Sequence, residues 1–362
     1  MIFNNPSGSS SVFEGFTGFY GNSSAATAII TNTAAEVAGI DSGQTYFTNT
    51  ARAGSATVIC NGANVSGAGG GTCFFTGNST ADNAILTAMG GANGGAGGLI
   101  QFDDSTTADS ARVVLSGNGT LNISFHALGP LTLGSLEGDG GEVTLGGKSL
   151  VVGSNDFDTV FGGQIQEHGS VTKTGTGTLT LSGANTYTGA TVVSAGALKA
   201  ANRSGSATGT GALNVNAGTL AGKGTISGAV TIGTGSGSGA FLAPAAGTNV
   251  QAMLTIQSAL TFNADATYAY TFRAKRNRAK TDQVIASGVM INSGAMIALS
   301  GQTQGRLTTG LTLTLISNTS ANPISGTFSD LPDGAIVTVN GNHLQASYSG
   351  GDGNDLTLTV VP

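Results

Sequence analysis

The residues that could do chemistry in this chain are few, because charged residues make up only 9% of its 362 positions. The densest group is a basic run that holds five of the thirteen Lys and Arg residues: Arg273, Lys275, Arg276, Arg278 and Lys280. One interpretation of such a run is an electrostatic contact with an anionic cell surface, sugar or lipid head group. The alternative is a solvated loop between two strands.

Residues 350–358 read GGDGNDLTL and match the nonapeptide repeat of calcium-binding arrays. Asp352 and Asp355 would supply the carboxylates, together with backbone carbonyls of the glycine turn. Calcium in such arrays lies between successive turns, and this sequence has one copy. A Gly-Asp turn that leads into a terminal strand is the alternative, and we expect no metal and no cofactor.

The two cysteines, Cys60 and Cys73, are separated by the flexible sequence NGANVSGAGGGT. In an oxidising compartment they could close a small ring, worth roughly 3 kcal/mol on the chain-entropy model. Two buried thiols are the alternative, because the sequence gives no distance between them. Two cysteines without a nearby His are too few ligands for a zinc site.

Close carboxylate pairs are the feature that would favour an enzyme, since β-helical polysaccharide lyases and hydrolases use clustered Asp. Asp103 and Asp104 are sequence neighbours, and neighbours on a strand point to opposite faces. Asp156 and Asp158 could share a face, but no matching cluster occurs one coil before or after them. We therefore predict that these acids are solvated in loops and that the chain is not an enzyme.

The elements that must position these residues are short strands. Between Gly169 and Ala200, apolar residues alternate with small polar ones, so Leu179 and Leu181 share one face of a strand. Glycines end each strand after a few residues, and no apolar run has the helical period. Short strands separated by tight corners, repeated many times, are typical of a parallel β-solenoid. The composition agrees, with 60 Gly and only 6 Pro.

The N-terminal third has a repeat of its own. Four phenylalanines lie 28, 28 and 27 residues apart, and each precedes two alanines, by six and by nine positions. The phenylalanines are Phe19, Phe47, Phe75 and Phe102. A solenoid stacks equivalent residues, so this period predicts one coil per repeat, an interior stack of rings and alanines in a narrow corner.

From about Leu121 the signature changes to apolar–Thr–apolar triplets, such as Leu131-Thr132-Leu133 and Leu254-Thr255-Ile256. Their outer residues would point into the core and Thr would point out. These changes of pattern divide the chain into three segments. They are the Phe/Ala coils of residues 1–120, a triplet-rich β-helix over 121–240, and a C-terminal β-helix and capping region over 241–362.

One stretch is similar to a known family. The sequence TKTGTGTLTLSGANTYTG and the V-x-x-G-x-L segment ending in Lys199 resemble the autotransporter-associated β-strand repeat. The last residues, from SGTFSDLPDG onward, resemble the C-terminal end of the same passenger domains. The resemblance implies an all-β, right-handed, single-stranded parallel β-helix. It also implies export through the periplasm to the bacterial surface, with a repeat that assists export and folding.

The function expected from sequence is therefore a surface-displayed structural passenger or stalk. An adhesin or glycan-binding module is the main alternative, followed by a polysaccharide-active enzyme and by a filament formed through the solenoid ends. Expected partners are surface glycans or proteins of a host or neighbouring cell. The net charge of −6 argues against nucleic acid, and membrane attachment would need a translocator or anchor outside this sequence.

Overall fold

The computed structural model describes residues 1–5, 15–127, 129–237, 239–246 and 250–362, which form 36 strands and no helix. No membrane-spanning helix is therefore found in the described part of the chain. The strands belong to two compact units, Met1–Gly189 and Ala190–Pro362. The expected all-β fold of stacked parallel strands is confirmed in each unit.

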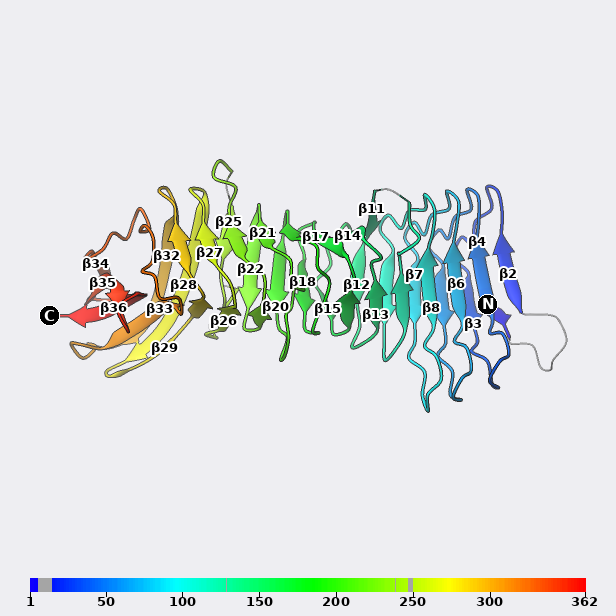
Figure 1. Cartoon of the computed structure of the whole chain (residues 1–362), viewed down its shortest axis with the longest axis horizontal. Coiled ribbons are helices and arrows are strands. Elements are labelled where there is room, and N and C mark those ends of the chain that lie inside the picture. Colours follow the sequence, from blue (N-terminus) through cyan, green and yellow to red (C-terminus); the bar gives the residue numbers. More distant parts are fainter. Residues whose placement is uncertain (6–14, 128, 238, 247–249) are drawn as a thin grey trace. The chain divides into compact units, whose positions relative to one another are not determined.

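Two long parallel sheets run through the first unit, and neighbouring strands in a sheet come from successive coils (Figure 1). One sheet contains β1 (Ile2–Asn4), β3 (Ile29–Asn32), β5 (Thr57–Cys60), β7 (Ile85–Ala88), β9 (Arg112–Leu115) and β12 (Ser135–Glu137). The other contains β2 (Phe16–Phe19), β4 (Gln44–Phe47), β6 (Thr72–Phe75), β8 (Leu99–Phe102), β10 (Thr120–Asn122), β13 (Glu142–Thr144) and β16 (Gln164–Gln166). Later coils add β11 (Pro130–Leu133), β14 (Lys148–Val152) and β17 (Gly169–Lys173), and the pair β15 (Thr159–Phe161) and β18 (Thr178–Leu181).

Each strand turns every second side chain into the coil. In β6, Cys73 and Phe75 are fully buried, whereas Thr72 and Phe74 face outward and are only partly buried. Equivalent residues of the early coils are 28 positions apart, as for Asn4 and Asn32, and those of later coils are 21 apart, as for Ser149 and Ser170. The prediction of one coil per Phe/Ala repeat is confirmed.

The phenylalanine stack is present as predicted. The rings of Phe19, Phe47, Phe75 and Phe102 lie nearly parallel, with centroids 4.8, 4.8 and 4.6 Å apart. The alanines form the corner, where the amide of Ala56 donates to the carbonyl of Ala53 and both side chains are fully buried. A larger side chain has no room in such a tight turn, which explains why alanine recurs there.

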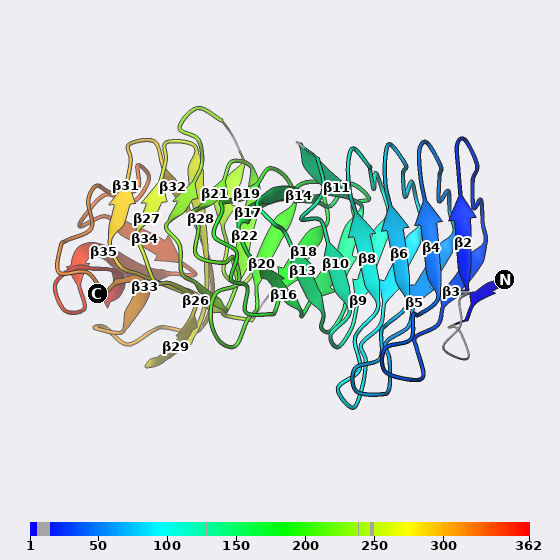
Figure 2. The same cartoon turned by 45° about the vertical axis from the view of Figure 1, so that its right-hand side comes forward.

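The early coils are longer than the later ones because three loops, residues 33–43, 61–71 and 89–98, project together from them (Figure 2). Ala35, Ala63 and Ala68 form a small buried cluster within these loops. Backbone hydrogen bonds join neighbouring loops, such as the amide of Ala63 to the carbonyl of Ala96 at 2.8 Å. The stacking of coils therefore continues into their loops.

The second unit is also built from parallel coils. Its first sheet contains β19 (Thr191–Val193), β21 (Leu213–Val215), β24 (Val230–Ile232), β27 (Leu260–Phe262) and β31 (Val289–Ile291). The next contains β20 (Ala197–Ala200), β22 (Gly218–Gly222), β25 (Ala240–Leu242), β28 (Ala266–Lys275), β29 (Arg278–Thr281) and β32 (Met296–Gln304). The third contains β23 (Thr225–Ile226), β26 (Met253–Ile256), β30 (Gln283–Ala286), β33 (Thr312–Asn318), β36 (Asp355–Val361), β35 (Asn342–Gly350) and β34 (Ile336–Val339).

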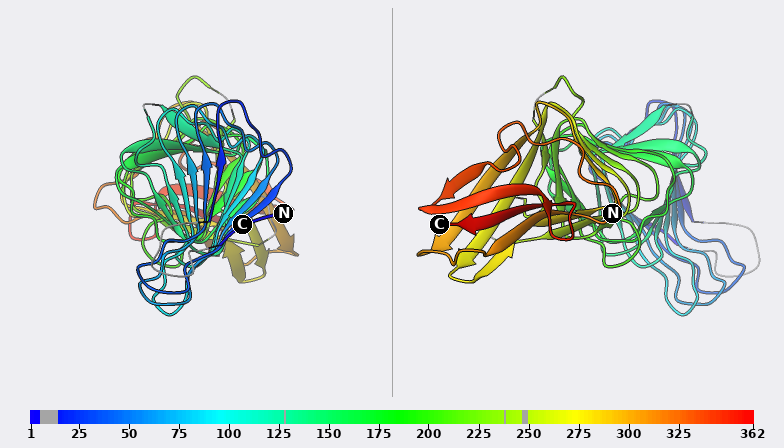
Figure 3. Two further views of the ribbon diagram at one scale, coloured as in Figure 1. Left: turned by 90° about the vertical axis from the view of Figure 1, so that its right-hand side faces the viewer. Right: turned by 60° about the vertical axis from the view of Figure 1, so that its left-hand side comes forward.

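The last part of this unit changes from parallel to antiparallel pairing. β28 pairs with β29 as a hairpin, and β33, β36, β35 and β34 pair antiparallel in that order (Figure 3). The expectation that the Thr of each apolar–Thr–apolar triplet points outward also fails here, because Thr357 between Leu356 and Leu358 is buried. The segment boundaries predicted at residues 120 and 240 fall within β10 and β25, so those changes of repeat pattern do not divide compact units.

Two adjacent phenylalanines test the interior stack. Replacing Phe75 by Ala removes a ring that is packed on both faces, and we expect the free energy of unfolding to fall by about 3–5 kcal/mol. Phe74 is the matched control, because it stacks on Tyr46 but lies on the partly exposed outer face. Its replacement by Ala should cost about 1 kcal/mol. Urea unfolding followed by circular dichroism measures both, and equal losses would contradict the interior stack.

Candidate functional site

The basic run forms most of a β-hairpin. Arg273 and Lys275 lie on β28, Arg276 occupies the turn with a φ of 51°, and Arg278 and Lys280 lie on β29. Four of these five residues therefore lie on strands and not in the expected loop, although all five are exposed to solvent. The reason is the alternation before the turn, where Tyr268, Tyr270, Phe272 and Ala274 are buried and the residues between them face outward.

Strand register places the cations in two rows on one outward face, which we call the basic face. Arg273 lies between Lys280 on β29 and Gln302 on β32. In the second row, Lys275 lies between Arg278 and Gln304. All four cations are exposed, and directly opposed like charges destabilise a strand pair.

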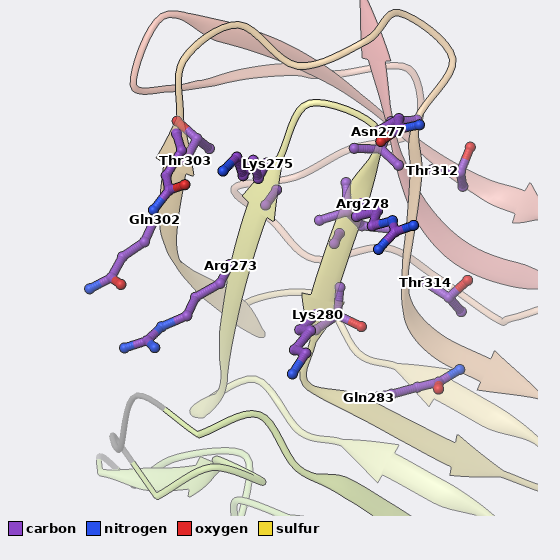
Figure 4. A pocket seen from close by; sticks show the side chains of 16 residues that line it. Arg273, Lys275, Asn277, Arg278, Lys280, Gln283, Gln302, Thr303, Thr312 and Thr314 are labelled. Atoms are coloured by element: carbon purple, nitrogen blue, oxygen red, sulfur yellow. The ribbon is translucent and has the colours of Figure 1, made fainter.

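Polar groups surround this hairpin. Its residues line an open hollow of about 980 Å³ together with Gln302, Thr303 and Gln304 of β32 and Thr312 and Thr314 of β33 (Figure 4). The amides and hydroxyls can donate and accept hydrogen bonds, and the cations can only donate. The described residues contain no group of three His, Cys, Asp or Glu side chains that could hold a metal ion. The cations and the polar groups around them therefore make this hollow suited to binding an anion.

Asp282 holds the base of the hairpin. Its carboxylate accepts hydrogen bonds from the amide of Thr271 at 3.0 Å, the hydroxyl of Thr271 at 2.8 Å and the amide of Ala252 at 2.9 Å. Asp282 is fully buried, and burial raises the pKa of this carboxyl above its ordinary value, although the hydrogen bonds oppose the rise. Sequence reasoning missed this residue, which directly follows β29.

The tip of the hairpin is also held. The amide of Thr308 donates to the carbonyl of Arg276 at 2.8 Å, which ties the turn to the segment after β32. Asn342 fixes that segment from the other side, because its side chain accepts from the amide of Leu307 at 2.7 Å. The segment carries an exposed cation, Arg306, that the sequence analysis did not select.

The calcium-like nonapeptide spans the end of β35, the turn after it and the start of β36, and these two strands run antiparallel. Asp355 accepts a hydrogen bond from the amide of Asn318 at 2.9 Å, and Asp352 is exposed. Calcium arrays of this sequence type stack successive parallel turns. The structure thus places the motif in a single antiparallel hairpin, where its aspartate fixes a neighbouring strand.

The carboxylates of Asp156 and Asp158, which were considered for catalysis, also accept hydrogen bonds from the backbone. Asp156 accepts from the amide of Thr176, and Asp158 accepts from the amide of Thr178, both at 2.6 Å. Each bond joins one coil to the next. Lys173 is buried beside them, its ammonium donates to the carbonyls of Thr174 and Gly175, and burial lowers its pKa.

Cys60 and Cys73 lie on β5 and β6 and are free, fully buried thiols, as in the second alternative. Cys60 takes the interior position that Asn32 occupies one coil earlier, and Cys73 takes that of Thr45. Burial raises the pKa of Cys60 to about 12, and burial likewise raises the pKa of Cys73. Both residues therefore act in this structure as small core side chains.

Comparison with known families gives one match. Residues 171–200 match the passenger-associated-transport-repeat. In the structure these residues contribute Val171, Leu179 and Leu181 to the core of the first unit and Val193 and Leu198 to the core of the second. No curated protein matches the chain.

Whether the two cysteines are free or bonded can be tested by counting the thiols that react with a maleimide. In the native protein, burial should keep both thiols unreactive toward a maleimide, because the thiolate is the reactive form. We expect two thiols to react when the protein is unfolded in denaturant without a reductant. A second sample, unfolded with a reductant, gives the total. No reaction before reduction would show a Cys60–Cys73 disulfide instead.

The raised pKa of Asp282 predicts a pH dependence of stability. The folded state holds this proton more tightly than the unfolded chain does. The contribution of Asp282 is therefore greatest below the ordinary pKa of 3.8 and declines as the pH rises through the raised value. The unfolding free energy of the wild type minus that of Asp282→Asn should decline across this range in urea titrations.

Asp265 provides a control, because its pKa shift and therefore its pH dependence of stability have the opposite sign. Partial burial opposes the shift, but hydrogen bonds from the amides of Thr234 and Gly235 outweigh it and lower the pKa of this carboxyl. Its contribution is present above the ordinary value of 3.8 and is lost as the pH falls through the lowered value. Slopes of the same sign for Asp265→Asn and Asp282→Asn would contradict the assigned shifts.

Proposed function

We propose that this chain, which carries a passenger-associated transport repeat at residues 171–200, is a structural passenger or stalk that an autotransporter displays on the cell surface. The transport repeat is the observation that carries the proposal, because it indicates an autotransporter passenger. The coils around the repeat are consistent with a display role. Their interiors consist mainly of aliphatic side chains, such as Val171, Leu179 and Leu198.

The proposed role of the repeat is to assist folding during export. In a solenoid each coil contacts only its neighbours, so folding can spread coil by coil. Within the repeat, β17 pairs with β14 over five residues, and β20 pairs with β22 over four. Each strand that leaves the export pore would therefore find a folded neighbour on which to pair.

We also propose that the passenger is not an enzyme. Asp156 and Asp158, the pair best placed for catalysis, each accept a hydrogen bond from a backbone amide of the next coil. A carboxylate held in this way is poorly available for proton transfer to a substrate.

Two adjacent residues of the repeat provide the test. The chain is fused to a signal peptide and an autotransporter translocator, and surface exposure is measured on intact cells with an antibody. Leu179→Asp places a charge in the interior and should reduce surface exposure several-fold, with greater protease sensitivity of the displayed product. Thr180→Asp is the control on the outward face of β18 and should behave like the wild type.

Failure of the wild-type fusion to reach the surface would contradict the passenger role. Equal display of Leu179→Asp and Thr180→Asp would contradict a role of the folded repeat in export.

A further inference from the structure

The basic face has a charge that the rest of the chain does not share. Residues 266–318 contain six cations and one acid, Asp282, whereas the remaining residues contain seven cations and eighteen acids. Asp282 is buried, and its carboxylate already accepts hydrogen bonds from Thr271 and Ala252. The positive charge is therefore concentrated on one hairpin of an otherwise acidic chain.

Within the part of the chain that the structure describes, these cations form no ion pair. The ion pairs found among the described residues, Arg52–Asp82 and Arg112–Glu137, belong to the first unit. On the hairpin, Arg273 directly opposes Lys280, and Lys275 directly opposes Arg278. Like charges in this register weaken a hairpin, and an anion lying over the outward face of the two strands would relieve the repulsion.

The surroundings of the cations indicate which anion fits. The rows end in Gln302 and Gln304, and Thr312 and Thr314 lie across the hollow. Amides and hydroxyls suit the hydroxyl groups of sugars. The lining residues include no aromatic side chain on which a nucleobase could stack, and the exposed ones include no large apolar side chain that could enter a bilayer.

We propose that the basic face binds a linear acidic polysaccharide, one that carries carboxylate or sulfate groups along its length. Two rows about 7 Å apart along the strands allow successive anionic groups of one extended polymer to engage. The hairpin is held at its base by Asp282 and at its tip by Thr308, so little ordering is needed on binding. This binding goes beyond display and requires only the folded second unit.

The test compares two variants that change the net charge equally. The variant Arg273→Glu/Arg278→Glu places a carboxylate opposite each remaining lysine, which should stabilise the hairpin while removing the anion site. The control variant, Lys148→Ser/Lys199→Ser/Arg203→Ser/Lys223→Ser, loses four cations that lie outside the hairpin. Each protein is titrated with dextran sulfate, with alginate as a carboxylated polymer and with neutral dextran.

We expect the wild type to bind dextran sulfate, alginate or both at low salt and not to bind dextran. The hairpin variant should lose affinity at least tenfold, with a shallower dependence on salt and an unchanged or higher urea midpoint. The control variant should stay within about threefold of the wild type.

Three results would overturn the proposal. They are no binding of either acidic polymer by the wild type, equal losses in the two variants, and tighter binding to phosphatidylserine vesicles than to either polymer. The last result would indicate a membrane surface. Because purified protein is used, the outcome is independent of whether the chain is displayed by a translocator.

Discussion

In the middle of the first unit, the ring of Phe75 lies 4.8 Å from Phe47 on one side and 4.6 Å from Phe102 on the other. These distances equal the spacing of hydrogen-bonded strands, so backbone pairing and side-chain packing are satisfied by the same displacement from coil to coil. This fixed spacing between coils applies to the interior positions of the stack, because each side chain there packs on the equivalent side chain of the next coil. Identical flat rings or small aliphatic groups meet the condition, whereas stacked charges would repel. The scarcity of charged residues and the alanine corners both follow from it.

Two of the buried charged residues, Lys173 and Asp282, show what an exception requires. Lys173 donates its ammonium protons to backbone carbonyls, and Asp282 accepts from backbone amides. Backbone groups can serve in this way only where the regular ladder is interrupted, and both residues lie at such places, next to a turn or at the base of a hairpin. Each of these two buried charges therefore helps to fix the backbone at a turn or hairpin base. Its hydrogen bonds to the backbone make it poorly available to a ligand.

The parts of the fold that repeat could be predicted from the sequence, and the parts that occur once could not. The stack of rings could be predicted because Phe19, Phe47 and Phe75 recur at a regular spacing and are the same residue type. The basic run occurs once, so no repeat helps to place it. Its five charges obscure the alternation that predicts a strand, although Phe272 and Ala274 continue that alternation. The residues that hold the site, Asp282 and Asn342, are isolated polar residues whose partners lie on other strands. Their contacts depend on tertiary pairing that no local pattern specifies. The same reason explains the nonapeptide, whose sequence is compatible with a parallel turn or with the antiparallel turn between β35 and β36.

The change from parallel to antiparallel pairing is what allows charge to gather on the hairpin. In a parallel stack, an outward cation has the equivalent residue of the next coil as its neighbour, and repetition of the coil would extend the charge along the sheet. β29 instead folds back on β28, so two cations of one strand meet two of the other within a single hairpin. On the far side of β28, the parallel neighbour β32 presents Gln302 and Gln304, which are neutral. Most of the positive surface is thus gathered on one hairpin. Amides bound it on the β32 side, and the interior packing beneath it does not depend on its charge.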